Sequence, residues 1–202
     1  SLRRLGVEAL DLYQIHWPQP DADIEEGWEA IADLIRAGKV RFGGVSNFSL
    51  SQLQRVQSMH PVASLQPPYS MLARGVEAEL LPYCAAQGIG VIAYSPMQKG
   101  LLTGKVTAPW VAALPLDDHR RSDPKFQEPQ LSANLALVEV LRKIAAESGK
   151  TLPQLAIAWV LRRPEVTSAI VGARRPDQIE QTITGGDWQL AETQIAAIED
   201  LL

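Results

Sequence analysis

Short apolar runs alternate with longer amphipathic stretches along the whole chain. The first run, LDLYQIHW at residues 10–17, is short and largely apolar, as is typical of a strand covered by helices on both faces. Pro18 and Pro20 prevent the strand from continuing, so His16 is predicted at its carboxyl end. In βα proteins ligands bind at that edge. A single histidine at a strand end is more often structural than catalytic, so the rest of the chain has to decide its role.

The same alternation recurs five times. We predict strands at residues 10–17, 39–46, 62–66, 89–95 and 166–171, and helices at residues 24–37, 49–59, 75–87, 131–148, 151–163, from 176, and 192–202. This spacing predicts βα units and a parallel sheet. Five strands fit an open doubly wound sheet or the last five strands of an eight-stranded barrel, and the pattern alone does not choose between them. No Gly-rich dinucleotide fingerprint stands at a strand-to-helix junction, which disfavours the open-sheet dehydrogenases.

Capping residues set the predicted helix boundaries. Asp23 is placed to begin one helix, Ser49 with Gln52 has the spacing of a capping box, and Thr151 precedes another helix that has a proline in its first turn. Residues 100–130 show neither the periodic spacing of apolar residues typical of a helix nor that typical of a strand, and they contain several prolines. We therefore predict one domain over residues 1–202, with a loop insertion at residues 106–130 over the cofactor or substrate, or else a surface loop.

Composition narrows the class of protein. The chain has 202 residues, of which 46% are hydrophobic, enough for one sizeable core. Its net charge of −4 and sequence pI of about 5.4 disfavour binding to nucleic acid or to anionic membranes. No apolar run has the length of a membrane span. The single cysteine, Cys84, excludes an internal disulfide and predicts a buried thiol in a cytoplasmic protein. His60 and His119 are predicted at the surface, and no side-chain cluster has the spacing of a metal site.

Five stretches of the chain, in this order, resemble the aldo-keto reductase family. They are RLGVEALDLYQIHWPQP at residues 4–20, GKVRFGGVSNFS at 38–49, SLQPPYSML at 64–72, GIGVIAYSPMQKGLLTGK at 88–105 and SAIVGARRPDQIEQT at 168–182. The resemblance implies a (β/α)8 TIM barrel, of which this chain supplies roughly the last five βα units. It also implies hydride transfer between a nicotinamide cofactor, usually NADPH, and an aldehyde or ketone.

The resemblance further implies roles for residues at the strand ends. His16 corresponds to the histidine that hydrogen-bonds the substrate carbonyl, and Trp17 either lines the substrate pocket or covers the rim. The predicted contacts to the nicotinamide are Ser46, Asn47 and Gln66 to its carboxamide, and Tyr94 stacked on its ring. These side chains suit the task, because a carboxamide offers one acceptor and two donors, and an aromatic ring offers a flat surface.

Two later stretches correspond to the phosphate and adenosine contacts of the family. The predicted residues are Ser95, Met97, Lys99, Gly100 and Leu101 around the pyrophosphate, and Gly172, Arg174, Gln178, Gln181 and Thr182 around the adenosine phosphate and adenine. Thr182 stands where many members have Asn, which weakens the adenine contact. Arg174, just before a helix that Pro176 begins, favours an anion there, so NADP is preferred to NAD.

Each assignment has a structural alternative. Asn47 is also a suitable cap for the helix that follows it, and Gln66 a suitable partner for a loop carbonyl. Tyr94 fits the core of a strand, and Lys99 and Arg174 fit a solvated surface.

The resemblance also implies catalytic groups that this sequence lacks. The proton donor is a tyrosine, assisted by a lysine and an aspartate, from the first three βα units, and no DTA…YG-like stretch occurs here. Tyr13 lies three residues before His16, an odd offset that puts the two side chains on opposite faces of the strand. We therefore expect the C-terminal part of a reductase, inactive alone and completed by the missing N-terminal part of the barrel. The alternative is a non-catalytic nicotinamide-nucleotide-binding or regulatory subunit of the same fold.

Overall fold

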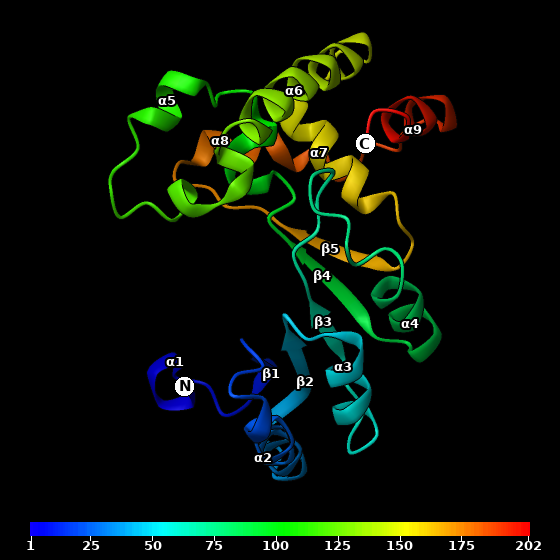
Figure 1. Cartoon of the computed structure of the whole chain (residues 1–202). Coiled ribbons are helices and arrows are strands. Elements are labelled where there is room, and N and C mark those ends of the chain that lie inside the picture. The colour runs from blue at the N-terminus through cyan, green and yellow to red at the C-terminus, as the bar shows by residue number, and fades with distance from the viewer. The chain divides into compact units, whose positions relative to one another are not determined.

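The computed structural model describes all residues from 1 to 202, which form five strands and nine α-helices joined by short 3-10 helices (Figure 1). In chain order the elements are α1 (Leu2–Leu5), β1 (Leu10–Ile15), η1 (Asp21–Asp23), α2 (Ile24–Arg36), β2 (Val40–Ser46), α3 (Leu50–Gln57), β3 (Ser64–Gln66), α4 (Leu80–Gln87), β4 (Gly90–Tyr94), η2 (Gln98–Thr103), α5 (Ala108–Ala112), η3 (His119–Ser122), η4 (Pro124–Phe126), α6 (Gln130–Glu147), α7 (Leu152–Leu161), β5 (Val166–Ile170), α8 (Pro176–Ile183) and α9 (Glu192–Glu199). Each predicted strand and helix is present, with ends shifted by up to a few residues in most cases. The largest difference is at α4, which was predicted from residue 75 and begins at Leu80, after a turn.

The five strands form one sheet in the order β1-β2-β3-β4-β5. The pairs β1–β2, β2–β3 and β3–β4 are parallel, as predicted. The strand order follows the chain without a reversal. An open doubly wound sheet reverses its strand order at a switch point, whereas consecutive strands of a TIM barrel are neighbours throughout. The order of the strands therefore decides for the barrel class, which the pattern of residues left open.

The chain packs as two compact units. Unit 1 consists of residues 1–68, 75–94 and 164–168, and unit 2 of residues 69–74, 95–163 and 169–202. The first contains β1 to β4, and the second contains α5 to α9. A single domain over residues 1–202 stays a prediction.

In unit 1, α2 packs against β1 and β2 through its apolar stripe. Ile24, Trp28 and Ile31 are buried on that stripe. A Cβ at Gly43 would lie 2.9 Å from Ile31 Cγ2 and 3.0 Å from the Trp28 ring, so the helix lies this close to β2 because residue 43 has no side chain. Asp23 stands at the N-cap of α2 but forms no capping bond, contrary to its predicted role.

The first turn of α3 forms the capping box predicted at its start. Ser49 Oγ accepts from the backbone N–H of Gln52, and Gln52 Oε1 accepts from the backbone N–H of Ser49. The two bonds satisfy amide groups that a helix start leaves unpaired.

The predicted burial of β1 on both faces is wrong. Leu12 is 37% exposed and Tyr13 is 39% exposed. The reason is the position of the strand, because β1 stands at the end of the strand order and pairs with β2 alone. A short apolar run predicts a strand, but its burial also depends on what lies beside it.

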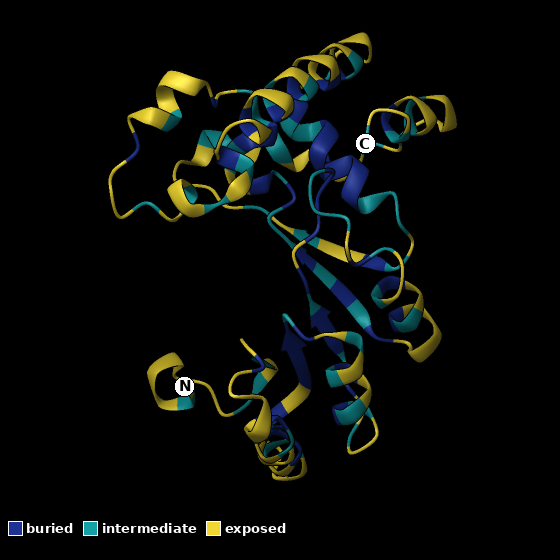
Figure 2. Cartoon of the chain, in the orientation of Figure 1, coloured by how far each residue is buried: buried dark blue, intermediate teal, exposed yellow.

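In unit 2, α7 is the most buried helix (Figure 2). It begins with a capping box between Thr151 and Gln154, as the sequence predicts for Thr151. Near its end, fully buried Trp159 lies against the Tyr69 ring, with the Arg162 guanidinium 3.6 Å from the centre of its ring system.

The same arginine ties the last helix to α7. Arg162 donates to Glu199 of α9 at 2.6 Å, and Arg74 donates to the other oxygen of that carboxylate at 2.5 Å. One carboxylate is thus shared between two guanidinium groups, and it attaches α9 to the segments that carry Arg74 and Arg162, which are distant from it in sequence.

Residues 106–130, predicted as a loop insertion, contain α5, η3 and η4 and no strand. The segment packs into unit 2, because Val106 and Phe126 are buried in one apolar cluster with Leu101 and Leu131. The prolines that suggested a loop stand within or beside these short helices, at Pro109 and Pro124 for example. A proline in the first turn of a helix is tolerated, because the amide it lacks has no partner there.

Candidate functional site

Polar side chains meet at the carboxyl ends of β2, β3 and β4. Ser46, Gln66 and Tyr94 are the last residues of these three strands, and Asn47 follows Ser46 directly. Ser46 Oγ donates to the backbone carbonyl of Gln66 at 2.8 Å, and the Tyr94 hydroxyl donates to Asn47 Oδ1 at 2.8 Å. Because the strands are parallel and in register, their ends lie along one edge of the sheet. The structure therefore brings these four predicted residues together in unit 1.

Asn47 holds this group in place. Its φ of 64° lies in the left-handed region, which asparagine tolerates better than most residues. Its Nδ2 donates to the backbone carbonyl of His16 and to Ser46 Oγ, both at 3.0 Å. Its backbone N–H donates to the carbonyl of Gln66 at 3.2 Å. The helix that follows is capped by Ser49, so the alternative role of Asn47 as a cap does not apply.

His16 joins the group through its backbone, and its imidazole is exposed. The centre of the His16 ring lies 5.9 Å from that of Trp17, whose side chain is also exposed. His16 thus has an accessible ring beside a rigid, hydrogen-bonded backbone. A neutral imidazole carries one N–H donor, which suits a carbonyl oxygen.

Tyr94 is half-buried, and burial raises the pKa of its phenol above the ordinary value of 10.0. The hydroxyl therefore stays protonated at neutral pH and keeps its bond to Asn47. This bond fixes the orientation of the ring. A tyrosine that only filled a strand core would not need such a bond.

Sequence reasoning missed Gln14 in β1. Its Oε1 accepts from Gln66 Nε2 at 2.9 Å, and its Nε2 donates to Ser64 Oγ at 3.1 Å. A signal for it was present, because Gln14 is a polar residue inside an apolar strand, two positions before His16 and so on the same face.

In unit 2, the residues predicted around the pyrophosphate form a tight loop. Ser95, Gln98 and Lys99 have φ values of 55°, 46° and 52°, and Gly100 has a φ of 105°. These left-handed residues fold the segment into a tight turn, in which the Gln98 N–H donates to the Ser95 carbonyl at 2.8 Å and the Gly100 N–H to the Met97 carbonyl at 3.0 Å. Met97 lies in the same loop and is partly buried.

Two of the predicted pyrophosphate residues are engaged within the chain. Lys99 Nζ lies 2.7 Å from Asp123 Oδ2, in the segment predicted to be an insertion. Burial alone would raise the pKa of Asp123, but bonds from Lys99 and from the Lys125 backbone hold it below its usual value, so the pair is ionic at neutral pH. Leu101 has a fully buried side chain in the apolar cluster, so only its backbone remains for a ligand.

Gln98, which the sequence reasoning did not select, anchors this loop through a buried side-chain hydrogen bond. Ser70 Oγ donates to Gln98 Oε1 at 2.7 Å, and both side chains are buried. A buried amide that needs a partner suggests a positional role. In the sequence its only signal is a glutamine between two positions of the matched stretch.

The residues predicted around the adenosine phosphate and adenine lie at and before α8. Gly172, Arg174 and Gln181 are exposed. Gln178 Oε1 accepts from the backbone N–H of Arg174 at 2.7 Å, and Thr182 Oγ1 donates to the backbone carbonyl of Gln178 at 2.8 Å. The hydroxyl of Thr182 and the backbone carbonyl of Gln178 are therefore bonded to each other inside the helix, and the side-chain oxygen of Gln178 is bonded to the backbone of Arg174.

Two adjacent arginines at the start of α8 differ in their partners. Arg175 donates to both oxygens of Asp177, at 2.9 and 3.0 Å. The guanidinium of Arg174 is exposed and has no ion pair or hydrogen bond in the chain. Of the two, Arg174 is the one left to meet an anion.

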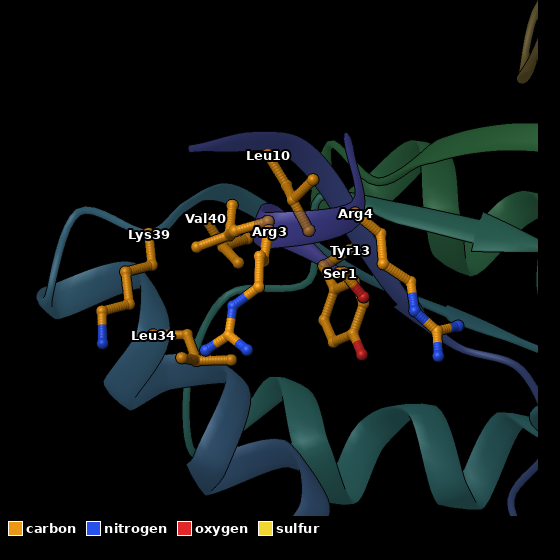
Figure 3. A pocket seen from close by; sticks show the side chains of 9 residues that line it. Ser1, Arg3, Arg4, Leu10, Tyr13, Leu34, Lys39 and Val40 are labelled. Carbon is orange, nitrogen blue, oxygen red and sulfur yellow. The ribbon is translucent and has the colours of Figure 1, made fainter. Parts of the chain in front are cut away.

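A hollow of about 460 Å³ lies elsewhere in unit 1, among α1, β1, α2 and the start of β2 (Figure 3). Tyr13 and Lys39 line it, and none of the predicted site residues does. Tyr13 thus faces this hollow, and takes no part in the network at the strand ends. No cluster of histidine, cysteine and carboxylate side chains is placed to hold a metal ion, and no helix has the length and apolar character to cross a membrane.

Comparison with known proteins identifies one family that the whole chain resembles. A family model described as "Aldo/keto reductase family" matches residues 1–202. The chain is 42% identical over 193 residues to aldo-keto reductase YhdN of Bacillus subtilis (strain 168), covering 94% of the chain and 57% of that protein. It is 33% identical over 204 residues to aldo-keto reductase str7 of Strobilurus tenacellus, covering 100% of the chain and 60% of that protein.

Among solved structures, the glycerol dehydrogenase AKR11B4 from Gluconobacter oxydans superposes with a TM-score of 0.91 at 38% identity. That match covers 100% of this chain and 61% of the other. The chain therefore spans somewhat less than two thirds of the length of each of these relatives.

Proposed function

The chain belongs to the aldo/keto reductase family, and on that basis we propose that the whole protein reduces aldehydes and ketones to alcohols by hydride transfer from NADPH. One observation carries the proposal. Ser46, Asn47, Gln66 and Tyr94 form a hydrogen-bonded group at the carboxyl ends of three neighbouring strands. In barrel enzymes this edge holds the reacting groups.

The chemistry of this group fits a nicotinamide. Gln66 Oε1 accepts no hydrogen bond within the chain, and Gln66 Nε2 has one N–H beyond its bond to Gln14. A carboxamide needs one donor and two acceptors from its site, and an amide with a free oxygen and a free N–H supplies one of each. Tyr94 adds a partly exposed ring that its bond to Asn47 holds in one orientation. When bound, the cofactor supplies the hydride that reduces the carbonyl carbon.

In this proposal His16 is the catalytic residue of the chain. Its imidazole N–H donates to the carbonyl oxygen of the substrate, where negative charge grows as the carbon is reduced. Asn47 is a positioning residue, because its Nδ2 donates a hydrogen bond to the His16 backbone carbonyl and so fixes the backbone that carries the imidazole. Trp17 is proposed to line the substrate side beside the His16 ring.

We propose NADP rather than NAD because of Arg174. An unpaired guanidinium suits a dianionic 2′-phosphate, and the neighbouring Arg175 is already neutralised by Asp177. Gly172, Gln178, Gln181 and Thr182 are proposed to lie along the adenosine, with the contacts of Gln178 and Thr182 limited to groups not used inside α8. The loop of Ser95, Met97, Lys99, Gly100 and Leu101 is proposed for the pyrophosphate, with Lys99 shared between the phosphate and Asp123.

The proton donor of the reaction is proposed to come from a part of the protein outside this sequence. Three relatives are each matched over about 57–61% of their length. The edge of β1 is consistent with a further strand there, because β1 has one neighbour and Leu12 is partly exposed. Without that portion we expect no turnover. We also propose a cytoplasmic protein, because Cys84 is a buried thiol without a disulfide.

The proposal is tested by measuring two quantities on the whole protein. Oxidation of NADPH is followed spectroscopically with a panel of aldehydes and ketones, and NADPH affinity is measured separately by fluorescence. We expect both binding and turnover, with NADH less effective. Because one relative is named a glycerol dehydrogenase, the panel includes small hydroxylated carbonyls and the reverse oxidation of glycerol. NADPH binding without turnover of any carbonyl favours the non-catalytic binding subunit instead, and absence of binding refutes both.

A further inference from the structure

A chain of side-chain hydrogen bonds in unit 1 joins β1 to β3 across the intervening strand β2. Gln14 in β1 donates from Nε2 to Ser64 Oγ in β3 at 3.1 Å. Gln66, also in β3, donates from Nε2 to Gln14 Oε1 at 2.9 Å. The intervening strand, β2, contributes no side chain to this path. Gln14 therefore connects two positions of β3 from a strand that does not pair with β3.

The glycine in β2 makes this connection possible. In the register of the sheet Gln14 pairs with Gly44, and Gly44 pairs with Ser64. A Cβ at Gly44 would lie 3.1 Å from Gln14 Cγ and would clash with Ser64 Oγ. Because residue 44 has no side chain, Gln14 lies across β2 and reaches its partners. The motif FGG at residues 42–44 thus has a purpose beyond the close approach of α2 at Gly43.

In the structure the bonds of Gln14 set which end of the Gln66 amide turns toward it. Gln14 Nε2 donates to Ser64 Oγ, which acts as the acceptor, and Gln14 Oε1 is the atom presented to Gln66. An amide oxygen only accepts, so Gln66 meets it with Nε2. The carbonyl oxygen of Gln66 is left pointing away from this bond, and it accepts no hydrogen bond within the chain. Gln66 is only partly buried, so a ligand has access to it.

We propose that Gln14 is a positioning residue that turns the Gln66 carbonyl oxygen toward the ligand, so that the site selects a ligand group that donates a hydrogen bond, such as a primary amide. The inference rests on the proposed function, in which that group is the carboxamide of the nicotinamide cofactor. Gln14 itself does not touch the cofactor. It acts by excluding the flipped orientation of Gln66, in which Nε2 would face the ligand and a hydrogen-bond acceptor would be preferred.

The test compares two cofactors that differ only at the carboxamide. The 3-acetylpyridine analogue of NADP+ keeps the carbonyl oxygen but has a methyl group in place of the amide NH2. Dissociation constants for NADP+ and for this analogue are measured on the whole protein, and their ratio is the readout. We expect the wild-type protein to bind NADP+ more tightly by about fivefold, the value of one ordinary hydrogen bond. Charge and adenosine contacts are the same in both compounds and cancel.

Four variants separate the role of Gln14 from general damage. Gln14→Met removes both bonds at nearly the same size, and Ser64→Ala releases the Nε2 end of Gln14. In both, the Gln66 amide is free to turn, and we expect the ratio to fall toward one. Gln66→Met should abolish the preference, because it removes the contact itself. The control Gln87→Met, at an exposed position at the end of α4, should keep the wild-type ratio.

Affinity for 2′,5′-ADP, which has no nicotinamide, reports whether each variant is still folded. A wild-type ratio in Gln14→Met and Ser64→Ala, with the preference lost in Gln66→Met, overturns the role of Gln14 and leaves the proposed function intact. A wild-type preference for the analogue overturns the orientation of Gln66. Absence of NADP+ binding in the wild-type protein is instead a failure of the proposed function. If Gln14→Met does not fold, the result for Ser64→Ala decides.

Discussion

Asn47 Nδ2 donates to the backbone carbonyl of His16 at 3.0 Å, so that a left-handed residue after β2 fixes the end of β1. The two residues are 31 positions apart in the chain. Because His16 carries the exposed ring at the strand ends, the position of that ring depends on Asn47. A substitution of Asn47 can therefore lower the stability of the protein in two ways: by removing the side-chain amide, and by straining the left-handed backbone at residue 47.

The two costs can be measured with two variants of Asn47. Asn47→Gly removes the amide and keeps the left-handed backbone without strain, whereas Asn47→Ala removes the amide and adds strain. We expect Asn47→Ala to have a free energy of unfolding lower than that of Asn47→Gly by about 1 kcal/mol. Urea unfolding of both variants checks this. Equal stabilities would mean that residue 47 relaxes out of the left-handed region, contrary to its φ of 64°.

His16→Ala is expected to affect chemistry more than binding. The imidazole is exposed and bonded to nothing in the chain, so its removal leaves the network of Asn47 and Ser46 intact. The single-turnover rate of carbonyl reduction should fall by about 10²-fold or more, with little change in the dissociation constant of NADPH. Gln87→Met, at an exposed position at the end of α4 and away from the site, is the control. Equal losses in rate and NADPH binding for His16→Ala contradict its catalytic role.

Arg174→Ala should weaken binding of NADPH more than that of NADH. A charge-assisted bond to the 2′-phosphate is worth about 1.5–3 kcal/mol, which corresponds to roughly 10- to 100-fold in affinity. NADH lacks that phosphate and should lose little. Arg175→Ala provides the matched control, because its guanidinium is already bound by Asp177. An unchanged NADPH-to-NADH ratio in Arg174→Ala would rule out this assignment.

Ser70→Ala should destabilise unit 2. The variant leaves the buried carbonyl oxygen of Gln98 without its donor, which costs about 1–3 kcal/mol in the free energy of unfolding. Ser122→Ala removes an exposed hydroxyl that donates to the His119 carbonyl, and should change stability by less than about 0.5 kcal/mol. Chemical denaturation of both variants makes the comparison. A Ser70→Ala variant as stable as Ser122→Ala would show that water replaces the lost hydroxyl.

The thiol of Cys84 predicts a pH dependence of stability. Burial raises the pKa of Cys84 from 9.0 to about 11 in the folded protein. Between these values the folded chain holds a proton that the unfolded chain has released, so the thiol's contribution to stability is complete below pH 9 and is lost as pH rises toward 11. The stability difference between wild type and Cys84→Ala should therefore narrow across that interval. Urea unfolding at several pH values measures it, and a constant difference would contradict the raised pKa.

Local pattern determined most of the secondary structure of this protein. A helix start depends on a few neighbouring residues, and the capping boxes at Ser49 and Thr151 were therefore readable in the sequence. A sequence pattern can place a capping residue without showing that its side chain forms the capping hydrogen bond. Asp23 stands at the start of α2 as predicted, but its side chain forms no such bond. The resemblance of ordered motifs likewise indicated the family, because five matching stretches constrain the chain far more than one.

What the sequence could not decide is which distant groups meet. The bond from Gln14 to Ser64 joins residues 50 positions apart and exists because of the register of three strands and the missing side chain at Gly44. The burial of Leu101 and the exposure of Leu12 likewise depend on neighbours from other parts of the chain. Hydrogen bonding and burial are properties of atoms brought together in space, so the residues at the strand ends were predictable from the sequence, while their partners were decided by the tertiary structure.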